Sequence, residues 1–156
     1  MNFLIVSPSY PPRLFYFAKR LKAAGFNVFG IGDAPYAQFN SDLKSSLRYY
    51  VRQPLECYDP NGGIIETTYL PIYKKIERLA KEYGKIDYVE SFNEWWLPLD
   101  ARIRLDFDAE GVRPDELEWL IKKSKMKERF RDAGAVTVRG EIVGDVQRRG
   151  DRVDRS

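Results

Sequence analysis

Histidine is absent from this chain of 156 residues, and cysteine occurs once, as Cys57. Without histidine there is no Ser-His or Cys-His nucleophile pair and no histidine-ligated metal. A single cysteine excludes an internal disulfide and a zinc site built on paired cysteines. Because no histidine is present to activate its thiol, Cys57 is predicted to be a small, half-buried apolar side chain rather than a nucleophile.

Long apolar runs and an excess of one charge are also missing. No run of about 18 apolar residues occurs, so no membrane span is expected, and the apolar run at residues 3–6 is too short for a signal peptide. The cytoplasm is therefore the expected location. The 26 basic and 23 acidic side chains leave a formal net charge of +3, which is too balanced for the basic stripe of a nucleic-acid-binding protein. We expect neither a membrane nor a nucleic acid as partner.

The chain has enough apolar material for one ordinary domain. It is 44% hydrophobic and 14% aromatic, a composition typical of globular proteins. Residues 145–156 differ, because they hold four arginines and three aspartates, no aromatic residue and only two valines. Such a segment buries too little apolar surface to offset the entropy of ordering its backbone. It is predicted to be a disordered charged tail rather than an arginine-rich contact arm.

Strand and helix patterns alternate through the first part of the chain. Residues 2–8 and 26–32 are short apolar runs, typical of strands that are buried on both faces. Helical spacing of apolar residues connects them, from Pro12 near the helix start to Ala24 before a glycine. A strand–helix–strand unit of this kind makes parallel strands with a right-handed crossover.

The remaining predicted elements follow the same alternation. In chain order they are a short helix at 39–47 capped by Asn40 or Ser41, a strand at 48–52, a loop at 53–63, a helix at 70–83, a strand at 86–90, a helix at 98–106, a helix from 114 that splits near Lys123 and Ser124 and ends at Gly134, and an extended start at 136–138. This alternation predicts an open, mostly parallel α/β sheet flanked by helices.

Two predicted loops lie where ligands of open α/β sheets bind, beyond the carboxyl ends of the strands. The first consists of Ser7, Pro8, Ser9 and Tyr10. Its hydroxyls and backbone N–H groups precede a predicted helix N-terminus, which favours an anion or a carbonyl oxygen. A rigid strand-to-helix turn is the alternative interpretation. No glycine occurs between residues 1 and 24, so a glycine-rich phosphate-binding loop is excluded here.

The second loop places two carboxylates, an amide and a hydroxyl directly after a predicted strand, at residues 90–94. Glu90 can accept hydrogen bonds from an amine or hydroxyl of a ligand, Asn93 can fix the ligand's orientation, and Glu94 is a further candidate for binding it. Capping of the following helix by Asn93 or Glu94 is the alternative. Trp95 and Trp96 are predicted to pack in the core or in an interface rather than to stack on a ligand.

These features together resemble the N-terminal portion of ATP-grasp ligases, over residues 1–143. The segments that carry the resemblance are the opening strand–turn–helix, the acidic turn at 90–94, the helix at 99–104 and the segment at 123–134. The resemblance implies a Rossmann-like pre-ATP-grasp domain at 1–112 and the incomplete start of an ATP-grasp domain at 113–144, with the disordered tail at 145–156.

The function that this resemblance implies is that of the substrate-side domain of an ATP-dependent ligase, which joins a carboxylate to an amine or thiol through an acyl phosphate. ATP and magnesium are the cofactors of the full-length family. Lys123 is similar to a lysine that contacts the ATP phosphates, and its neighbour Lys125 stays open for this role. The family's other ATP and magnesium ligands would lie downstream. We therefore expect this chain alone to have no catalytic or metal-binding residue, to bind ATP at most weakly and to be inactive.

The expected partners are a small-molecule carboxylate and either a missing C-terminal domain or a second copy of the chain. Two other functions fit parts of the sequence. The N-terminal half of a nucleotide-sugar glycosyltransferase shares the strand, the prolines and the amphipathic helix, although that family usually has Gly-Gly where this chain has Arg13 and Leu14. A stand-alone flavodoxin-like binding module is the other alternative, and the identity of the substrate stays open.

Overall fold

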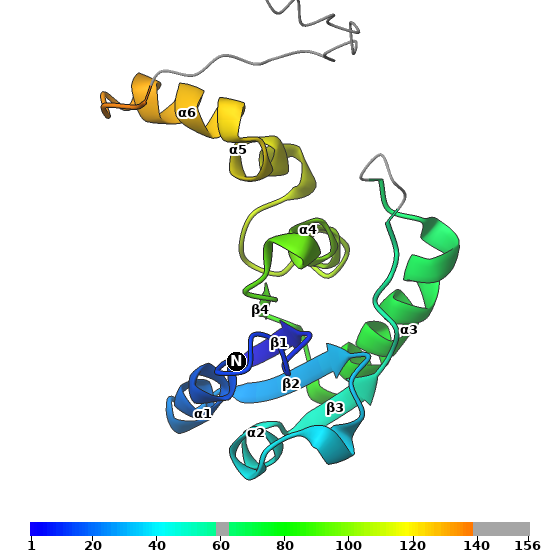
Figure 1. The fold of residues 1–156 in the computed structure, drawn as a ribbon. Helices are drawn as coiled ribbons and strands as arrows, with labels where there is room; N and C mark the ends of the chain where they lie inside the picture. Colours follow the sequence, from blue (N-terminus) through cyan, green and yellow to red (C-terminus); the bar gives the residue numbers. More distant parts are fainter. Residues whose placement is uncertain (59–62, 139–156) are drawn as a thin grey trace, which may run out of the picture. The chain divides into compact units, whose positions relative to one another are not determined.

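In the described part of the chain, four parallel strands form a sheet in the order β3-β2-β1-β4 (Figure 1). The computed structural model describes residues 1–58 and 63–138. The strands are β1 (Asn2–Val6), β2 (Asn27–Gly32), β3 (Tyr49–Arg52) and β4 (Tyr88–Glu90). The predicted open, parallel α/β sheet is therefore confirmed. The tail predicted at 145–156 and the ATP-grasp start expected at 139–144 lie outside the described residues.

The sheet reverses its winding between β1 and β4. The chain first adds β2 and β3 on one side of β1 and then returns to place β4 on the other side. Leu4 pairs with Phe29 of β2, and Ile5 pairs with Glu90 of β4. In open α/β sheets, such a switch point opens a crevice at the carboxyl ends of the two strands.

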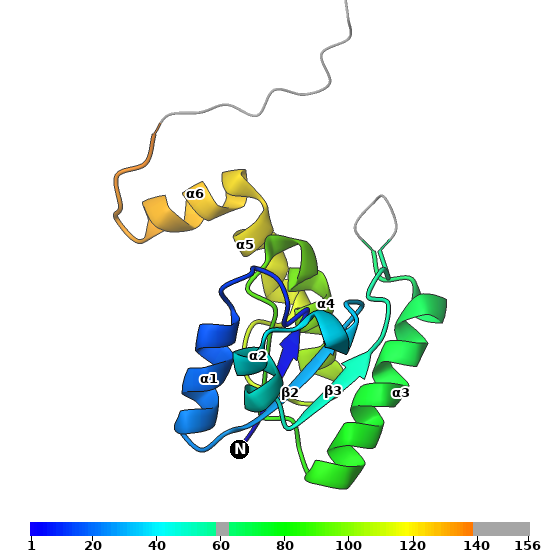
Figure 2. The ribbon, with the colours of Figure 1, turned by 60° about the horizontal axis from the view of Figure 1, so that its bottom comes forward.

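Helices cover both faces of the sheet, as Figure 2 shows. Helices α1 (Phe15–Ala23) and α2 (Ser41–Ser46) lie on one face, and α3 (Glu66–Tyr83) and α4 (Leu97–Asp106) cover the other. Successive strand residues point to opposite faces, so the apolar run of β1 feeds two cores. Leu4 and Val6 pack with α3 and α4, while Phe3 and Ile5 pack with α1 and α2.

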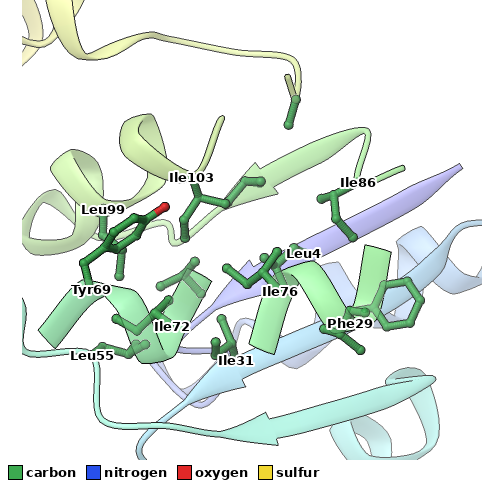
Figure 3. Packing of buried hydrophobic residues seen from close by; sticks show 14 of the residues in the cluster. Leu4, Phe29, Ile31, Leu55, Tyr69, Ile72, Ile76, Ile86, Leu99 and Ile103 are labelled. Carbon is green, nitrogen blue, oxygen red and sulfur yellow. The ribbon is translucent and has the colours of Figure 1, made fainter. Parts of the chain in front are cut away.

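The larger core lies between the sheet and the helices α3 and α4 (Figure 3). It joins Leu4, Phe29 and Ile31 from the strands to Ile72, Ile76, Leu99 and Ile103 from the helices, all of them fully buried. This double coverage explains why β1 and β2 are continuous apolar runs: every residue of β1, and every residue of β2 after the first, is buried.

Two helices begin at other residues than the sequence predicts. Helix α1 begins at Phe15, because residues 11–14 form a turn in which the Leu14 amide donates to the Pro11 carbonyl at 2.9 Å. Helix α3 begins at Glu66 and contains Pro71. Proline in the second turn of a helix removes one backbone hydrogen bond, and the buried Tyr69 anchors the turn that precedes it. Helix α2 (Ser41–Ser46) lies within the predicted range 39–47.

Asn40 caps helix α2. Its side-chain oxygen accepts a hydrogen bond from the Leu43 amide at 2.7 Å. Of the two predicted caps, Asn40 and Ser41, the structure therefore has the first. An asparagine cap satisfies one of the amides that a helix start leaves without a partner.

The chain divides into two compact units, Met1–Leu117 and Glu118–Ser156. The sheet and its covering helices belong to the first. The described part of the second contains most of α5 (Leu117–Ile121) and α6 (Lys123–Asp132), so the helix breaks at Lys122, beside the predicted split. Gly134 follows α6 with a φ of +78°, a conformation that favours glycine. Residues 136–138, predicted to be extended, belong to no strand.

In the described ranges, no helix combines the length and the apolar character needed to cross a membrane.

Candidate functional site

The two loops predicted to bind a ligand meet at the switch point of the sheet. Because Ile5 of β1 pairs with Glu90 of β4, the chain leaves both strands at the same edge. Each segment turns there through a residue with positive φ, Ser7 at 53° and Phe92 at 57°. Such values are uncommon outside glycine and cluster in turns and functional sites. The structure therefore brings the two predicted segments to one edge.

The loop after β1 is held mainly through its backbone. The Ser7 amide donates to the Ile31 carbonyl at 2.8 Å, and the Ser7 carbonyl accepts from the Tyr10 amide at 3.0 Å. Ser7 is buried, Ser9 is half-buried and Tyr10 is exposed. The Ser7 amide is thus occupied, and the loop does not run directly into α1. The groups best placed to meet a ligand are the side chains of Ser9 and Tyr10.

Pro8 packs against the glycines of β2. A Cβ atom at Gly30 would lie 3.0 Å from Cγ of Pro8, and one at Gly32 would lie 3.4 Å from Cδ. A contact of 3.0 Å is tighter than side chains usually make, so the missing side chain at Gly30 lets Pro8 lie against the strand. Pro8 therefore supports the backbone of the loop.

A buried arginine of α4 holds the end of β4. Arg104 is 2% exposed, and its Nε and Nη2 donate to the Val89 carbonyl at 3.0 and 2.6 Å. Nη2 also forms an ion pair with Glu90 Oε1 at 2.8 Å. A Cβ atom at Gly111, whose φ is +122°, would come within 2.8 Å of the Arg104 Nε. Glu90 is thus fixed in place by Arg104, while its side chain remains 40% exposed.

A buried aspartate of the same helix holds the turn after β4. Asp100 Oδ2 accepts from the Ser91 amide at 3.0 Å and from the Ser91 hydroxyl at 2.6 Å. In the described part of the chain, the buried Oδ1 atom of Asp100 has no hydrogen-bond partner. Burial raises the pKa of Asp100 from 3.8 to about 7, although the Ser91 hydrogen bonds and the Arg104 charge oppose the rise. Sequence reasoning did not single out Asp100, whose role depends on a contact with Ser91 in another element.

Asn93 begins the 3-10 helix η2 (Glu94–Trp96), where its Oδ1 atom accepts from the Trp95 amide at 3.0 Å. The capping alternative therefore describes what the Asn93 side chain does. Glu94 is exposed. Trp95 is 66% exposed and does not pack in the core, whereas Trp96 is half-buried and packs against the larger core cluster, as predicted.

Beside these loops, the same edge of the sheet carries a cleft of about 580 Å³. The residues that line it, here called the acidic–aromatic cleft, are Asp33, Pro54, Leu55, Glu56, Tyr58, Trp95 and Trp96. Asp33 directly follows β2, the segment that includes Glu56 follows β3, and the tryptophans follow β4. The predicted site residues do not line this cleft. Extending the rule of carboxyl ends to the second and third strands would have identified Asp33 and Glu56 from the sequence.

Tyr58 ties the wall of the cleft to the start of α4. Its hydroxyl accepts a hydrogen bond from the Leu99 amide at 2.8 Å, and burial strongly raises its pKa, so the phenol is neutral. The preceding Cys57 is fully buried. Burial raises the pKa of the Cys57 thiol to about 11, which makes it a poor nucleophile.

In the second unit, Lys123 is the first residue of α6 and is exposed. The neighbouring Lys125 forms an ion pair with Glu128 at 3.0 Å and lies 5.5 Å from the centre of the Trp119 ring. Arg129 also lies over that ring, at 4.5 Å. Lys125 is therefore engaged within the unit, whereas Lys123 forms no ion pair with the described residues.

Residues 1–58 and 63–138 contain no group of three or more His, Cys, Asp or Glu side chains that could hold a metal ion. Magnesium prefers several oxygen ligands in octahedral geometry. The described residues therefore do not fit a magnesium site of their own.

Comparison with solved structures identifies ligases of the same fold. The chain superposes on the crystal structure of L-amino acid ligase from Bacillus licheniformis with a TM-score of 0.58 and 22% identity, over 87% of this chain and 31% of that one. It superposes on phosphoribosylglycinamide synthetase from Anaerococcus prevotii with a TM-score of 0.52 and 15% identity, over 85% and 29% of the two chains. The predicted resemblance to the N-terminal portion of ATP-grasp ligases is confirmed for the fold.

The chain thus spans less than a third of the length of either ligase. No protein-family model and no curated protein sequence matches it. At these identities the likeness concerns the fold.

Proposed function

We propose that this chain is the substrate-side N-terminal domain of a cytoplasmic, ATP-dependent carboxylate–amine or carboxylate–thiol ligase of the ATP-grasp type. The observation that carries the proposal is the carboxyl edge of the sheet, where the switch point and the acidic–aromatic cleft lie side by side in a fold shared with two ligases. Ligands of open α/β sheets bind at such edges. A cleft of about 580 Å³ is within the usual range for small-molecule sites.

At the switch point, the proposed ligand is a small-molecule carboxylate. Ser9 and Tyr10 offer hydroxyl groups from the loop after β1, in which Ser7 and Pro8 set the backbone. Glu90 accepts from an amine or hydroxyl of the same ligand, because its orientation is fixed by Arg104 while its side chain is still partly exposed. Asn93 and Glu94 border the site through η2.

Lys123 is the residue proposed to meet the ATP phosphates. It starts α6, a helix with no acidic residue in its first turn. A helix N-terminus carries a partial positive charge. Lysine side chains at this position are therefore repelled by the helix end unless an anion is bound between them. Because Lys125 is engaged by Glu128, Lys123 is the better candidate of the two. When bound, ATP would supply the phosphoryl group that activates the carboxylate, and phosphate oxygens would have to supply most ligands of any magnesium ion.

Titration of the isotope-labelled chain with ATP, followed by NMR, tests this function. We expect weak binding, with a Kd above about 1 mM, and amide shifts centred on the first turn of α6. Lys123→Ala should abolish these shifts. Lys127→Ala, which removes a lysine from the same helix, is the matched control and should leave them in place.

The same titration with UDP-glucose and GDP-mannose separates this proposal from a glycosyltransferase half. Shifts caused by a nucleotide sugar but not by ATP would contradict the ligase proposal. The chain alone is also expected to show no ATP hydrolysis above background, because the described residues contain no magnesium site. Steady turnover that is lost in Lys123→Ala would contradict this expected inactivity.

A further inference from the structure

The acidic–aromatic cleft is built from the ends of three strands. Asp33 is the first residue after β2, Glu56 lies in the segment after β3, and Trp95 and Trp96 lie in η2 after β4. The side chains that line the cleft therefore come from three separate segments of the chain. Clefts of this kind, with mostly apolar walls and a few polar groups, are the usual form of small-molecule sites.

The charges that line the cleft are of one sign. Asp33 and Glu56 contribute carboxylates, and neither lysine nor arginine is among the described residues that line the cleft. Arg52 donates a hydrogen bond from its Nε to the backbone carbonyl of Asp33 at 3.1 Å. Within residues 1–58 and 63–138, neither carboxylate forms an ion pair, unlike the carboxylates of Glu90 and Asp106. Such a lining attracts a cation and repels a carboxylate.

The remaining walls are aromatic. The ring of Tyr58 lies 6.3 Å from that of Trp95, nearly perpendicular to it at 87°, and 6.1 Å from that of Trp96. The faces of tryptophan and tyrosine rings attract cations, and tryptophan does so most strongly. Trp95 also exposes two thirds of its surface, at 66%, so a ligand that covers it would bury apolar area.

A hydrogen bond fixes the wall of the cleft at Tyr58. The set of ligating side chains in the described residues favours an organic cation over a metal ion. Tyr58 is held by the Leu99 amide, and its raised pKa keeps the phenol neutral. No group of three metal-ligating side chains exists in the described part of the chain. A positive charge in the cleft would therefore contact two carboxylates and the faces of aromatic rings. An ammonium group on a carbon skeleton uses both kinds of wall.

We propose that the acidic–aromatic cleft binds the ammonium group of an amine-bearing small molecule. This inference rests on the proposed function in one respect, namely that the amine is the second substrate of the ligase. The carboxylate substrate lies at the neighbouring switch point, and the amine substrate enters the cleft between Asp33, Glu56 and Trp95.

Three ligands of matched shape test the charge preference. At about pH 6, below the pKa of an α-amino group, phenylalaninamide is mostly a cation, N-acetylphenylalanine is an anion and N-acetylphenylalaninamide is neutral. In NMR titrations of the full chain, phenylalaninamide should shift the amides of Asp33 and Glu56 and the indole of Trp95. The anion and the neutral ligand should leave these signals unchanged. Equal or tighter binding of the anion in the cleft, or no shift with the cation, overturns the inference.

Variants of the cleft test its residues. Asp33→Asn combined with Glu56→Gln should weaken phenylalaninamide binding by about tenfold or more, the change expected when about 1.4 kcal/mol of attraction is lost. Glu77→Gln combined with Asp115→Asn takes the same charge from surface sites outside the cleft and should leave the affinity unchanged. Trp95→Ala should also weaken binding, and because Trp95 is exposed the fold should persist. Undiminished binding by the Asp33/Glu56 double variant, or an equal loss in the control, contradicts the proposed site.

Failure of this inference and failure of the proposed function give different results. If phenylalaninamide binds in the cleft but ATP does not shift α6, the amine site stands and the ligase function falls. If ATP shifts α6 and N-acetylphenylalanine shifts Ser9 and Tyr10 while the cation leaves the cleft unshifted, the ligase function stands and the amine site falls.

Discussion

At the scale of single residues, Asp100 shows how the site is held from within. Its carboxyl group is fully buried and accepts two hydrogen bonds from Ser91. These bonds fix the start of the turn that leads to Asn93 and to η2. Its other oxygen has no partner among the described residues, so the charged form is poorly solvated and its pKa is raised to about 7.

This raised pKa makes the stability of the chain depend on pH. The folded state holds the proton of Asp100 more tightly than the unfolded state, whose pKa is near 3.8. The stabilisation that the bound proton of Asp100 gives to the folded state is therefore complete below pH 3.8 and is lost as the pH rises through about 7. Its size is about 1.4 kcal/mol for each unit of pKa difference between the two states. Asp100→Asn should flatten this part of the pH profile of the free energy of unfolding, measured with urea between pH 4 and pH 8.

Ser91→Ala provides the companion measurement. The Ser91 hydroxyl donates to the Asp100 carboxylate and lowers its pKa. Without that hydroxyl, the upper end of the pH window should move to higher pH. A profile that is the same in the wild type and in Asp100→Asn would show that other groups cause the dependence.

At the scale of elements, Arg104 couples α4 to β4. Its guanidinium donates to the carbonyls of Val89 and Val112 and pairs with Glu90. Because Gly111 lies against it without a side chain, the arginine fits a space formed by α4, β4 and the segment after α4. The position of Glu90 at the switch point therefore depends on a helix that follows it in the chain.

Arg104→Met should cost about 3 kcal/mol of unfolding free energy, because it leaves buried carbonyls unpaired and Glu90 without its cation. The matched control is Arg102→Met in the same helix. Arg102 pairs with Glu66 and Asp106 at a more exposed position, so its loss should cost about 1 kcal/mol or less. Urea unfolding of both variants checks this, and equal losses would contradict a special role for Arg104.

At the scale of the whole molecule, burial is concentrated in the first unit. All residues of both core clusters lie before Leu117, whereas α5 and α6 contain no buried residue. Helices of 5 and 10 residues are marginal without packing partners. This agrees with the expectation from the sequence that a further domain or a second copy of the chain is a partner.

Hydrogen exchange tests this difference between the units. Amides of β1 and β2 should exchange slowest, while those of α5 and α6 should exchange close to the rate of an open chain. Protection of α6 that equals that of β1 at low protein concentration would contradict the prediction. Protection that increases with concentration would instead indicate that a second copy is the partner.

Several features could be predicted from the sequence because they depend on local patterns. The apolar runs of β1 and β2, the cap at Asn40 and the break beside Lys123 each reflect residues close together in the chain. The start of α3 could not be predicted in this way, because Pro71 is a local signal for a helix start. The burial of Tyr69 against distant residues outweighed that signal.

The sequence by itself determined the class of the fold and the edge of the sheet where a ligand is proposed to bind, because apolar periodicity sets which faces are buried and parallel strands end together. Only the tertiary structure decided which side chains share that edge. Asp33, Glu56 and Trp95 are far apart in the chain and meet only because β2, β3 and β4 lie in one sheet. Asp100 and Arg104 likewise gain their roles from contacts with β4 and the turn after it, which helical spacing within α4 cannot reveal.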